Sequence, residues 1–96
     1  MVKEIAQFTA QPGKAEELLR GLQAGMAVIR RADGCRSIRL SRCVEDPNVF
    51  AYEVEWETLE HHTVTFRGGP LFAQYRSHIA GLFSEPVDVR HYATVA

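Results

Sequence analysis

The sequence has few of the features that would narrow its function at once, and cysteine is the first. Only two of the 96 residues are cysteines, Cys35 and Cys43. If both lie on one strand, a rise of about 3.3 Å per residue separates them by roughly 26 Å, whereas a disulfide needs Cα atoms within about 7 Å. This spacing excludes an intrachain disulfide and fits a reducing compartment. We interpret both as small buried side chains, because neither belongs to a Cys-His pattern.

Long apolar runs and a net excess of charge are also missing. No stretch approaches the roughly 18 to 20 apolar residues that span a bilayer, and Met1–Glu4 does not begin the apolar segment of a secretory signal. Eleven Lys and Arg residues face twelve Asp and Glu residues, without the clustered positive charge that follows a phosphate backbone. We therefore expect a cytoplasmic protein that binds neither membranes nor nucleic acid.

Common catalytic and metal-binding motifs are absent as well. The chain has no Ser-His-Asp set, no phosphate-binding glycine loop and no zinc-ligand spacing. Its histidines are His61, His62, His78 and His91. Adjacent helical residues point about 100° apart, so His61 and His62 are poorly placed to share one ion. We expect no metal and no cofactor, and interpret most of the histidines as polar groups at the surface or at a cavity edge.

What the sequence does contain is a regular alternation of strand and helix patterns over a single domain, residues 1–96. In the first strand Val2, Ala6, Phe8 and Ala10 are assigned to one face, and Phe50, Tyr52, Val54 and Trp56 alternate in the third. We expect strands over 2–10, 35–43, 49–56 and 87–95, and helices over 14–31, 59–66 and 70–83, the last ended by Pro86. The order β-α-β-β-α-β, with its second helix split, predicts an α+β ferredoxin-like fold with an antiparallel sheet and both helices on one face.

Apolar side chains occur in both phases of some strands. Ile5 is near Phe8, and Val89 is near Tyr92. Helices on one face would leave some of these side chains bare, and a bare apolar face is an association site. Face-to-face packing of two sheets would cover it, so we expect a homodimer.

Aromatic residues are concentrated where this fold could enclose a cavity between sheet and helices. Tyr52 and Trp56 share a strand face, His62 and Phe66 share a helix face, and Phe72, Tyr75 and Arg76 follow on the next helix. These rings could simply form a packed core. A cation at Arg76 and a titratable group at His62 favour instead a cavity that stabilises an anionic ligand.

Short motifs along nearly the whole chain resemble the antibiotic biosynthesis monooxygenase domain. They are Gln11-Pro12-Gly13-Lys14 with Glu16-Glu17-Leu18-Leu19, Asp33-Gly34-Cys35, Asp46-Pro47, Glu55-Trp56-Glu57, Arg67-Gly68-Gly69-Pro70-Leu71-Phe72 and Pro86-Val87. The resemblance implies a homodimeric α+β barrel with one cavity per subunit. Several members of this family oxygenate quinols or anthrones with molecular oxygen and no cofactor, the substrate's phenolate supplying the electron, whereas others cleave haem, isomerise or bind small signals.

The residues of the anthrone oxygenases in this family are partly kept. Trp56 ends the third strand as in those enzymes, and Arg76 matches their arginine, while Tyr52 and His62 replace an Asn and a Tyr. The His that quinol-oxygenase-like members carry near the end of the short helix is replaced by Thr65 or Phe66. The haem-degrading branch has Asn, Trp and His where this chain has Gln7 or Phe8, Phe66 and Arg76, which disfavours haem cleavage.

The resemblance therefore implies a cofactor-independent monooxygenase for a small phenolic, quinol or anthrone-like substrate. Arg76 would hold the phenolate oxygen, His62 would accept or relay its proton, and Trp56 would complete the catalytic set. The expected substrate-binding residues are Phe8, Tyr52, Phe66, Phe72 and Tyr75. Two alternatives stay open: a non-catalytic module that binds a small aromatic ligand or acts in a stress response, and a purely structural dimer.

Overall fold

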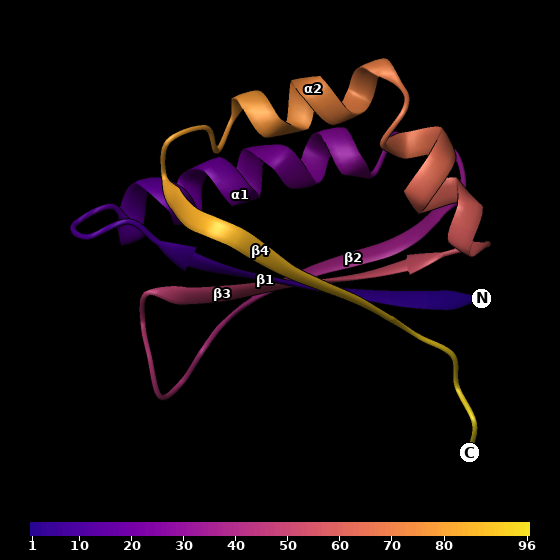
Figure 1. The fold of residues 1–96 in the computed structure, drawn as a ribbon, viewed down its shortest axis with the longest axis horizontal. Helices are drawn as coiled ribbons and strands as arrows, with labels where there is room; N and C mark the ends of the chain where they lie inside the picture. The colour runs from indigo at the N-terminus through magenta and orange to yellow at the C-terminus, as the bar shows by residue number, and fades with distance from the viewer.

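The computed structural model describes residues 1–96 as an antiparallel four-stranded sheet with the helices on one of its faces (Figure 1). The elements in chain order are β1 (Val2–Ala10), α1 (Ala15–Ile29), β2 (Cys35–Arg42), β3 (Val49–Trp56), η1 (His61–Phe66), α2 (Pro70–Ser77) and β4 (Phe83–Tyr92). The strands lie side by side in the order β2-β3-β1-β4, and all neighbouring pairs are antiparallel. This topology confirms the predicted α+β ferredoxin-like fold with a split second helix.

The two central strands bury one face against the helices. In β3 the alternating residues Phe50, Tyr52, Val54 and Trp56 are all buried, as their spacing predicts. In β1 the buried residues are Ala6, Phe8, Ala10 and also Glu4. Glu4 stands directly across from Val54, so the β1 face that was assigned from its apolar members contains a buried carboxyl group as well.

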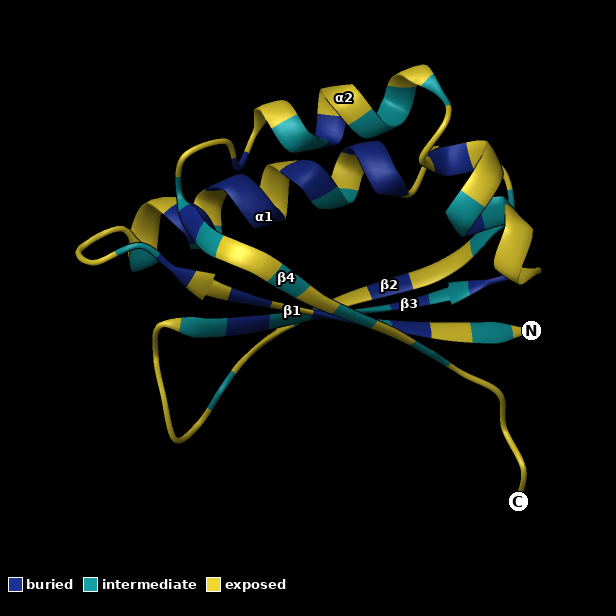
Figure 2. Ribbon diagram, viewed as in Figure 1, coloured by how far each residue is buried: buried dark blue, intermediate teal, exposed yellow.

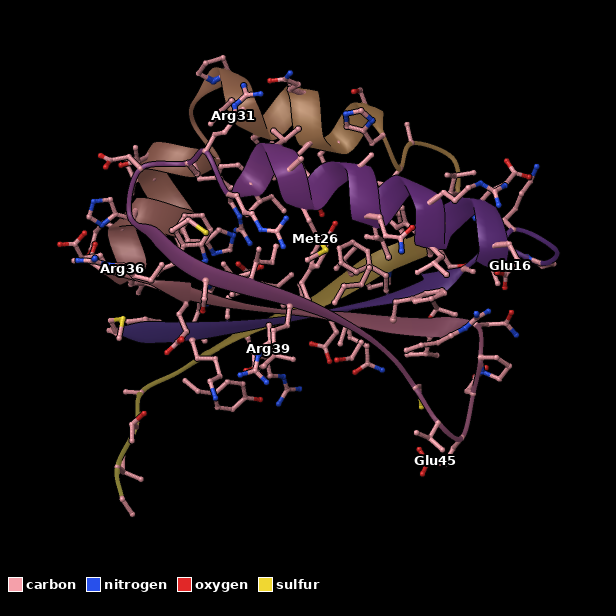
Figure 3. All side chains as sticks on the ribbon, turned by 180° about the vertical axis from the view of Figure 1, so that it is seen from behind. Glu16, Met26, Arg31, Arg36, Arg39 and Glu45 are labelled. Carbon is pink, nitrogen blue, oxygen red and sulfur yellow. The ribbon has the colours of Figure 1, made fainter.

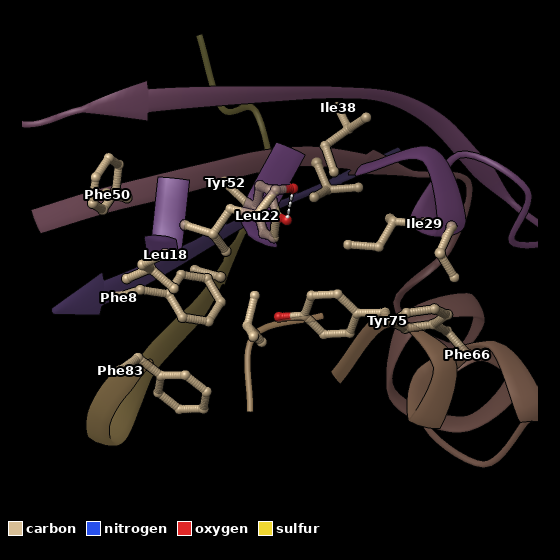
Figure 4. Close-up of a cluster of buried hydrophobic side chains, with 14 of the residues drawn as sticks. Phe8, Leu18, Leu22, Ile29, Ile38, Phe50, Tyr52, Phe66, Tyr75 and Phe83 are labelled. Atoms are coloured by element: carbon tan, nitrogen blue, oxygen red, sulfur yellow. Dashed lines mark hydrogen bonds between the residues drawn. The ribbon is translucent and has the colours of Figure 1, made fainter. Parts of the chain in front are cut away.

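Helix α1 lies across the sheet and supplies most of the second layer. Leu18, Leu22, Val28 and Ile29 are buried against the sheet, while Met26 points toward the sheet and Glu16 outward (Figure 3). Buried residues occur in both layers (Figure 2). Their side chains meet in one core (Figure 4). Within it the Tyr52 hydroxyl donates a hydrogen bond to the Leu22 carbonyl, which ties β3 to α1.

Two glycines let α2 pack closely on α1. A Cβ atom at Gly21 would lie 2.3 Å from the His78 carbonyl oxygen, and one at Gly25 would lie 2.9 Å from the Tyr75 ring and 3.0 Å from the Tyr52 hydroxyl. These separations are shorter than non-bonded carbon atoms accept. The glycines therefore set the height at which α2 rests on α1, and with it the space left between α2 and the sheet.

The expected helix over 70–83 and the strand over 87–95 are placed wrongly. Helix α2 ends at Ser77, and Gly81, with a φ of +77°, turns the chain into β4 at Phe83. Leu82 and Phe83 continue the helical apolar spacing, but they reach the same core from a turn and a strand. The apolar stripe alone cannot distinguish these two routes.

Pro86 lies inside β4 and ends no helix. Strand β4 is at the edge of the sheet, and Gln7 pairs with Asp88 while Thr9 pairs with Ser84. The segment 85–87 therefore bulges opposite Phe8. An edge bulge leaves backbone donors unpaired and accepts a proline.

The sheet face away from the helices is more polar than the strand patterns suggested. It carries Ile5 and the half-exposed Tyr92, but charged side chains surround them, including a Lys3–Glu53 pair with N–O 3.8 Å. Arg39 also projects from this face (Figure 3). Cys35 begins β2 and Cys43 directly follows its last residue. Both are free thiols, and both are only partly buried rather than buried as expected. No helix is both long enough and apolar enough to span a bilayer.

Candidate active site

A cavity of about 370 Å³ lies between the helical layer and strands β1, β3 and β4. Ten of its 16 lining residues are hydrophobic, and a volume of this size suits one small-molecule ligand. Helix α2 rests on α1 at the height set by Gly21 and Gly25, and the rings below it do not fill the space down to the sheet. The cavity is therefore a consequence of how the two layers are spaced.

All eight residues expected to form the site line this one cavity. They are Phe8, Tyr52, Trp56, His62, Phe66, Phe72, Tyr75 and Arg76. The sequence placed them on four elements, and the structure has them on β1, β3, η1 and α2. Their common location is a geometric fact, whereas the role assigned to each remains a prediction.

Aromatic rings form one continuous wall. The Trp56 and His62 rings stack at a centroid distance of 5.1 Å and an angle of 16°, and Phe66 lies 5.6 Å from Trp56. Phe66 in turn meets Phe72 edge-on at 5.6 Å. Such pairs hold each ring in place beyond the effect of burial alone, so the wall is a set of fixed ring faces and edges against which a ligand can pack.

The short segment η1 brings His62 and Phe66 to the cavity together. It is a π-helix, with the Arg67 N–H donating to the His62 carbonyl at 3.2 Å, five residues back. This wider winding keeps residues four apart on one side. The sequence predicted a short helix here but not its π form, since no residue preference marks it.

The Arg76 guanidinium lies near the rim of the cavity. It stands over the Phe83 ring at 5.0 Å and the Phe72 ring at 5.7 Å, and it contacts the Glu85 carboxylate at 3.5 Å. Its side chain is more than one-third exposed. The ring faces orient the cation, while the exposed and distant pair with Glu85 is weak, so an anionic ligand group could compete for Arg76.

A chain of polar side chains interrupts the apolar wall of the cavity. The Trp56 indole N–H donates to Glu4 Oε1 at 2.8 Å, and the same oxygen lies 3.4 Å from His62 Nε2. His62 Nδ1 is 2.7 Å from His91 Nε2 on β4. Glu4 and His62 line the cavity, whereas His91 lies behind His62.

Burial shifts the pKa values of Glu4, His62 and His91 in the directions that favour their uncharged forms. It lowers the pKa of His62 from 6.5 to about 4, with the nearby positive charge of Arg67 adding to the effect. It raises the pKa of Glu4, although the hydrogen bond from Trp56 acts in the opposite direction. The His91 pKa is lowered too, first by burial and then by Arg67. The close contact between Glu4 and His62 is therefore not a permanent ion pair.

The two tyrosines in the wall stay protonated. Burial is the largest cause that raises the pKa of both Tyr52 and Tyr75. Tyr52 is fully buried and its hydroxyl is used by the Leu22 carbonyl, so it forms the floor of the cavity. Tyr75 reaches the same region from α2 (Figure 4).

Sequence reasoning missed Glu4 as a site residue and left His91 among the general polar histidines. A signal was present in both cases. Alternate residues of a strand point to the same face of the sheet. Glu4 therefore shares the inward face of its strand with Ala6 and Phe8, and His91 shares that of its strand with Val87 and Val89, so each places an ionisable group on the inward face. Arg67, which also lines the cavity, directly follows η1; it begins one of the motifs of the family resemblance but was given no role in the site.

The cavity does not bring together a metal-binding set. No group of three or more His, Cys, Asp or Glu side chains is arranged to hold a metal ion. The short separation of His62 from His91 is that of a hydrogen bond, with the two ring nitrogens facing each other. The donors of this cluster are engaged with one another.

Comparison with known proteins gives consistent matches. Residues 1–77 match the family model described as antibiotic biosynthesis monooxygenase. The crystal structure of a Bordetella bronchiseptica protein assigned to these monooxygenases is 33% identical, with a TM-score of 0.92, and the match covers 99% of this chain and 97% of that one.

More distant matches extend the same picture. The uncharacterised Bacillus subtilis protein YczJ is 28% identical over 95 residues, covering 99% of this chain and 100% of its own length. The structure of SnoaB, a cofactor-independent oxygenase from Streptomyces nogalater, has a TM-score of 0.80 at 16% identity, over 97% of this chain and 91% of SnoaB. At that identity the similarity to SnoaB concerns the fold alone.

Proposed function

Because the chain belongs to the antibiotic biosynthesis monooxygenase family, we propose that it is a cofactor-independent monooxygenase acting on a small phenolic, quinol or anthrone-like substrate. The observation that carries this proposal is the cavity itself. A wall of stacked rings, a buried histidine and a cation at the rim all face one space of about 370 Å³. The family model that matches residues 1–77 supports the same reaction class.

In this proposal the substrate supplies the electrons. An anthrone-like ring CH₂ group becomes C=O, one oxygen atom of O₂ enters the product and the other leaves as water. Ionisation of the substrate hydroxyl makes the ring electron-rich enough to react with oxygen. The protein contributes by binding the ring, stabilising the oxyanion and handling the proton.

Each cavity residue has a defined part. Trp56, Phe66 and Phe72 bind the flat faces of the rings and exclude water, with Phe8, Tyr52 and Tyr75 completing the apolar wall. Arg76 exchanges its weak contact with Glu85 for the substrate oxyanion. His62, neutral near pH 7 because burial lowers its pKa to about 4, accepts or relays the hydroxyl proton.

The test is oxygen uptake with a panel of quinols and anthrones. Wild type should consume oxygen with at least one member of the panel, and Arg76→Ala should lower this rate by a factor of about 100 or more. Arg20→Ala, which removes an exposed arginine on α1, is the matched control and should behave as wild type. If Arg76→Ala retains full activity, the role assigned to Arg76 is wrong.

A second candidate is a module that binds the same ligands without turnover. It is favoured by Thr65 and Phe66, which stand where quinol-oxygenase-like relatives carry a histidine. Tight binding of panel members, measured by quenching of Trp56 fluorescence, together with no oxygen uptake would select this candidate. Trp56 is the only tryptophan of the chain, so the signal reports on the cavity.

The active form in this proposal is a homodimer that packs the open sheet faces together. Ile5 and Tyr92 supply the apolar contacts, and the surrounding charged residues supply a polar rim, an arrangement common at protein interfaces. The charges also keep an unpaired chain soluble. Sedimentation equilibrium of wild type measures the stoichiometry, and a stable monomer would exclude this assembly.

A further inference from the structure

Glu4, His62 and His91 form a continuous chain of polar contacts from the cavity to the outer strand. Glu4 and His62 touch the cavity, and His91, only partly buried on the edge strand β4, follows at 2.7 Å. Trp56 holds Glu4 Oε1 in place from the side. Of these three residues the proposed function assigns a role to His62 alone, and none to Glu4 or His91.

His62 and His91 are joined by a hydrogen bond of 2.7 Å, and Glu4 and His62 by a longer contact of 3.4 Å. Protons can be arranged along these two contacts in two directions. In the first, protonated Glu4 donates to His62 Nε2, and His62 Nδ1–H donates to His91 Nε2. In the second, His91 Nε2–H donates to His62 Nδ1, and His62 Nε2–H donates to the ionised carboxylate of Glu4. The observed contacts suit both directions, because an imidazole donates from one nitrogen and accepts at the other.

The two arrangements differ by one proton. Starting from protonated Glu4, the carboxyl proton moves to His62 Nε2, the Nδ1 proton of His62 moves to His91 Nε2, and the Nδ1 proton of His91 leaves to water. Each transfer breaks one O–H or N–H bond and forms another. The result is a Glu4 carboxylate, two neutral imidazoles with reversed tautomers, and one proton in solvent.

We propose that Glu4, His62 and His91 are a proton path through which a ligand hydroxyl in the cavity loses its proton to solvent. Once the path has emptied Glu4, its carboxylate takes the hydroxyl proton of the ligand: the ligand O–H bond breaks and a carboxyl O–H bond forms. The ligand remains as an oxyanion beside a neutral Glu4. Two negative charges therefore never share the cavity.

The groups around the path favour a ligand oxyanion beside a neutral Glu4. The titratable and charged groups around the path are Cys35 on β2, Tyr52 on β3, Tyr75 on α2 and Arg67 after η1. Arg67 is the only cation among them, and it also lines the cavity, where it would stabilise the ligand oxyanion. Burial raises the pKa of Glu4 and so favours its return to the neutral form.

This path defines a substrate class more narrowly than the cavity does. The ligand must carry an acidic phenolic or enolic hydroxyl on a flat apolar ring, so that the hydroxyl meets Glu4 and His62 while the rings lie on Trp56. A ligand whose hydroxyl is replaced by a methoxy group has no proton to release. The catalytic use of the path rests on the proposed function, but the path itself can be tested without turnover.

The first experiment follows the imidazole nitrogens of the ligand-free protein by NMR across pH. In wild type, His62 and His91 should change tautomer together, in one transition, as Glu4 gains or loses its proton. Glu4→Gln should remove this transition, whereas His78→Gln, which replaces an exposed histidine at the end of α2, should keep it. Independent behaviour of the two rings, or the same transition in Glu4→Gln, overturns the proposal.

The second experiment measures proton release directly, with 4-nitrophenol as probe because its anion is yellow. Mixed with the protein below its own pKa in a stopped-flow instrument, the bound probe should ionise, and His91→Phe should slow this step about 100-fold. His78→Phe is the control, and an unchanged rate in His91→Phe overturns the proposal. If the joint tautomer change of His62 and His91 is observed but no oxygen uptake is found, the monooxygenase proposal is rejected. The proton path would then still be supported.

Discussion

The uncharged state of His62 makes a quantitative prediction about stability at low pH. His62 is only about 4% exposed, and its pKa falls from 6.5 to about 4 in the folded protein. In the unfolded chain the histidine gains a proton as the pH drops below 6.5, while in the folded chain it does not until about pH 4. Folding stability due to His62 is therefore present above pH 6.5 and is lost as the pH falls toward 4.

The size of this loss follows from the shift. One pKa unit corresponds to about 1.4 kcal/mol, so a shift from 6.5 to about 4 gives about 3 kcal/mol between pH 6.5 and pH 4. Small domains have total stabilities of roughly 5–15 kcal/mol. His62 alone should therefore account for a sizeable part of the acid sensitivity of the protein.

Glu4 affects the pH dependence of folding stability in the opposite direction. Its folded pKa is raised above 4.5, so the folded state holds that proton more tightly and gains stability as the pH falls. The wild-type curve contains both effects. Comparison with His62→Gln separates them, since glutamine keeps polar atoms near Glu4 and His91 but does not titrate.

The assay is urea denaturation followed by Trp56 fluorescence, at one fixed protein concentration, from pH 7 to pH 4. The difference in unfolding free energy between wild type and His62→Gln should shrink by about 3 kcal/mol as the pH falls. His78→Gln should follow the wild-type curve. Parallel curves for wild type and His62→Gln would refute the conclusion that His62 is buried uncharged.

Three further predictions concern the supports of the site. Glu4→Ala leaves the buried Trp56 N–H without its acceptor and should lower stability by about 1–3 kcal/mol in urea denaturation, and Glu4→Gln should restore most of it. Gly25→Ala improves helix propensity by about 1 kcal/mol but places Cβ 2.9 Å from the Tyr75 ring; thermal unfolding should show a net loss, and a rise in melting temperature would contradict the packing argument. Tyr92→Glu, across from Lys3, should keep the fold and shift the dimer to monomer in sedimentation, whereas unchanged dimers would exclude Tyr92 from the interface.

Regular alternation of apolar and polar residues was enough to predict the strands. The boundary between a helix and a strand could not be predicted where both patterns fit the same residues. Strand β3 was placed correctly because its inward residues alternate without exception. The start of β4 was misplaced because Leu82 and Phe83 satisfy a helical stripe and an inward strand phase equally well. Only the turn at Gly81, which depends on how α2 docks on α1, decides between them.

The candidate site was also predictable in part. Large rings at inward positions were predictable as a group, because rings on facing elements must meet in a ferredoxin-like fold. Whether they fill the interior or leave a cavity depends on the height of α2 above the sheet. That height is set by Gly21 and Gly25, which the sequence analysis did not identify because a glycine adds nothing to an apolar stripe.

The contacts of Glu4 show why a buried ionisable residue tells more about a site than another buried ring does. A carboxyl group on an inward strand phase lowers stability unless donors meet it, so Glu4 implies partners before they are seen. The structure supplies Trp56 N–H at 2.8 Å and His62 at 3.4 Å, and His62 in turn needs a partner for its second nitrogen, which His91 provides. One inward carboxyl thus requires the next two groups in succession, and a core built only for stability would place a leucine at position 4 and need none of them.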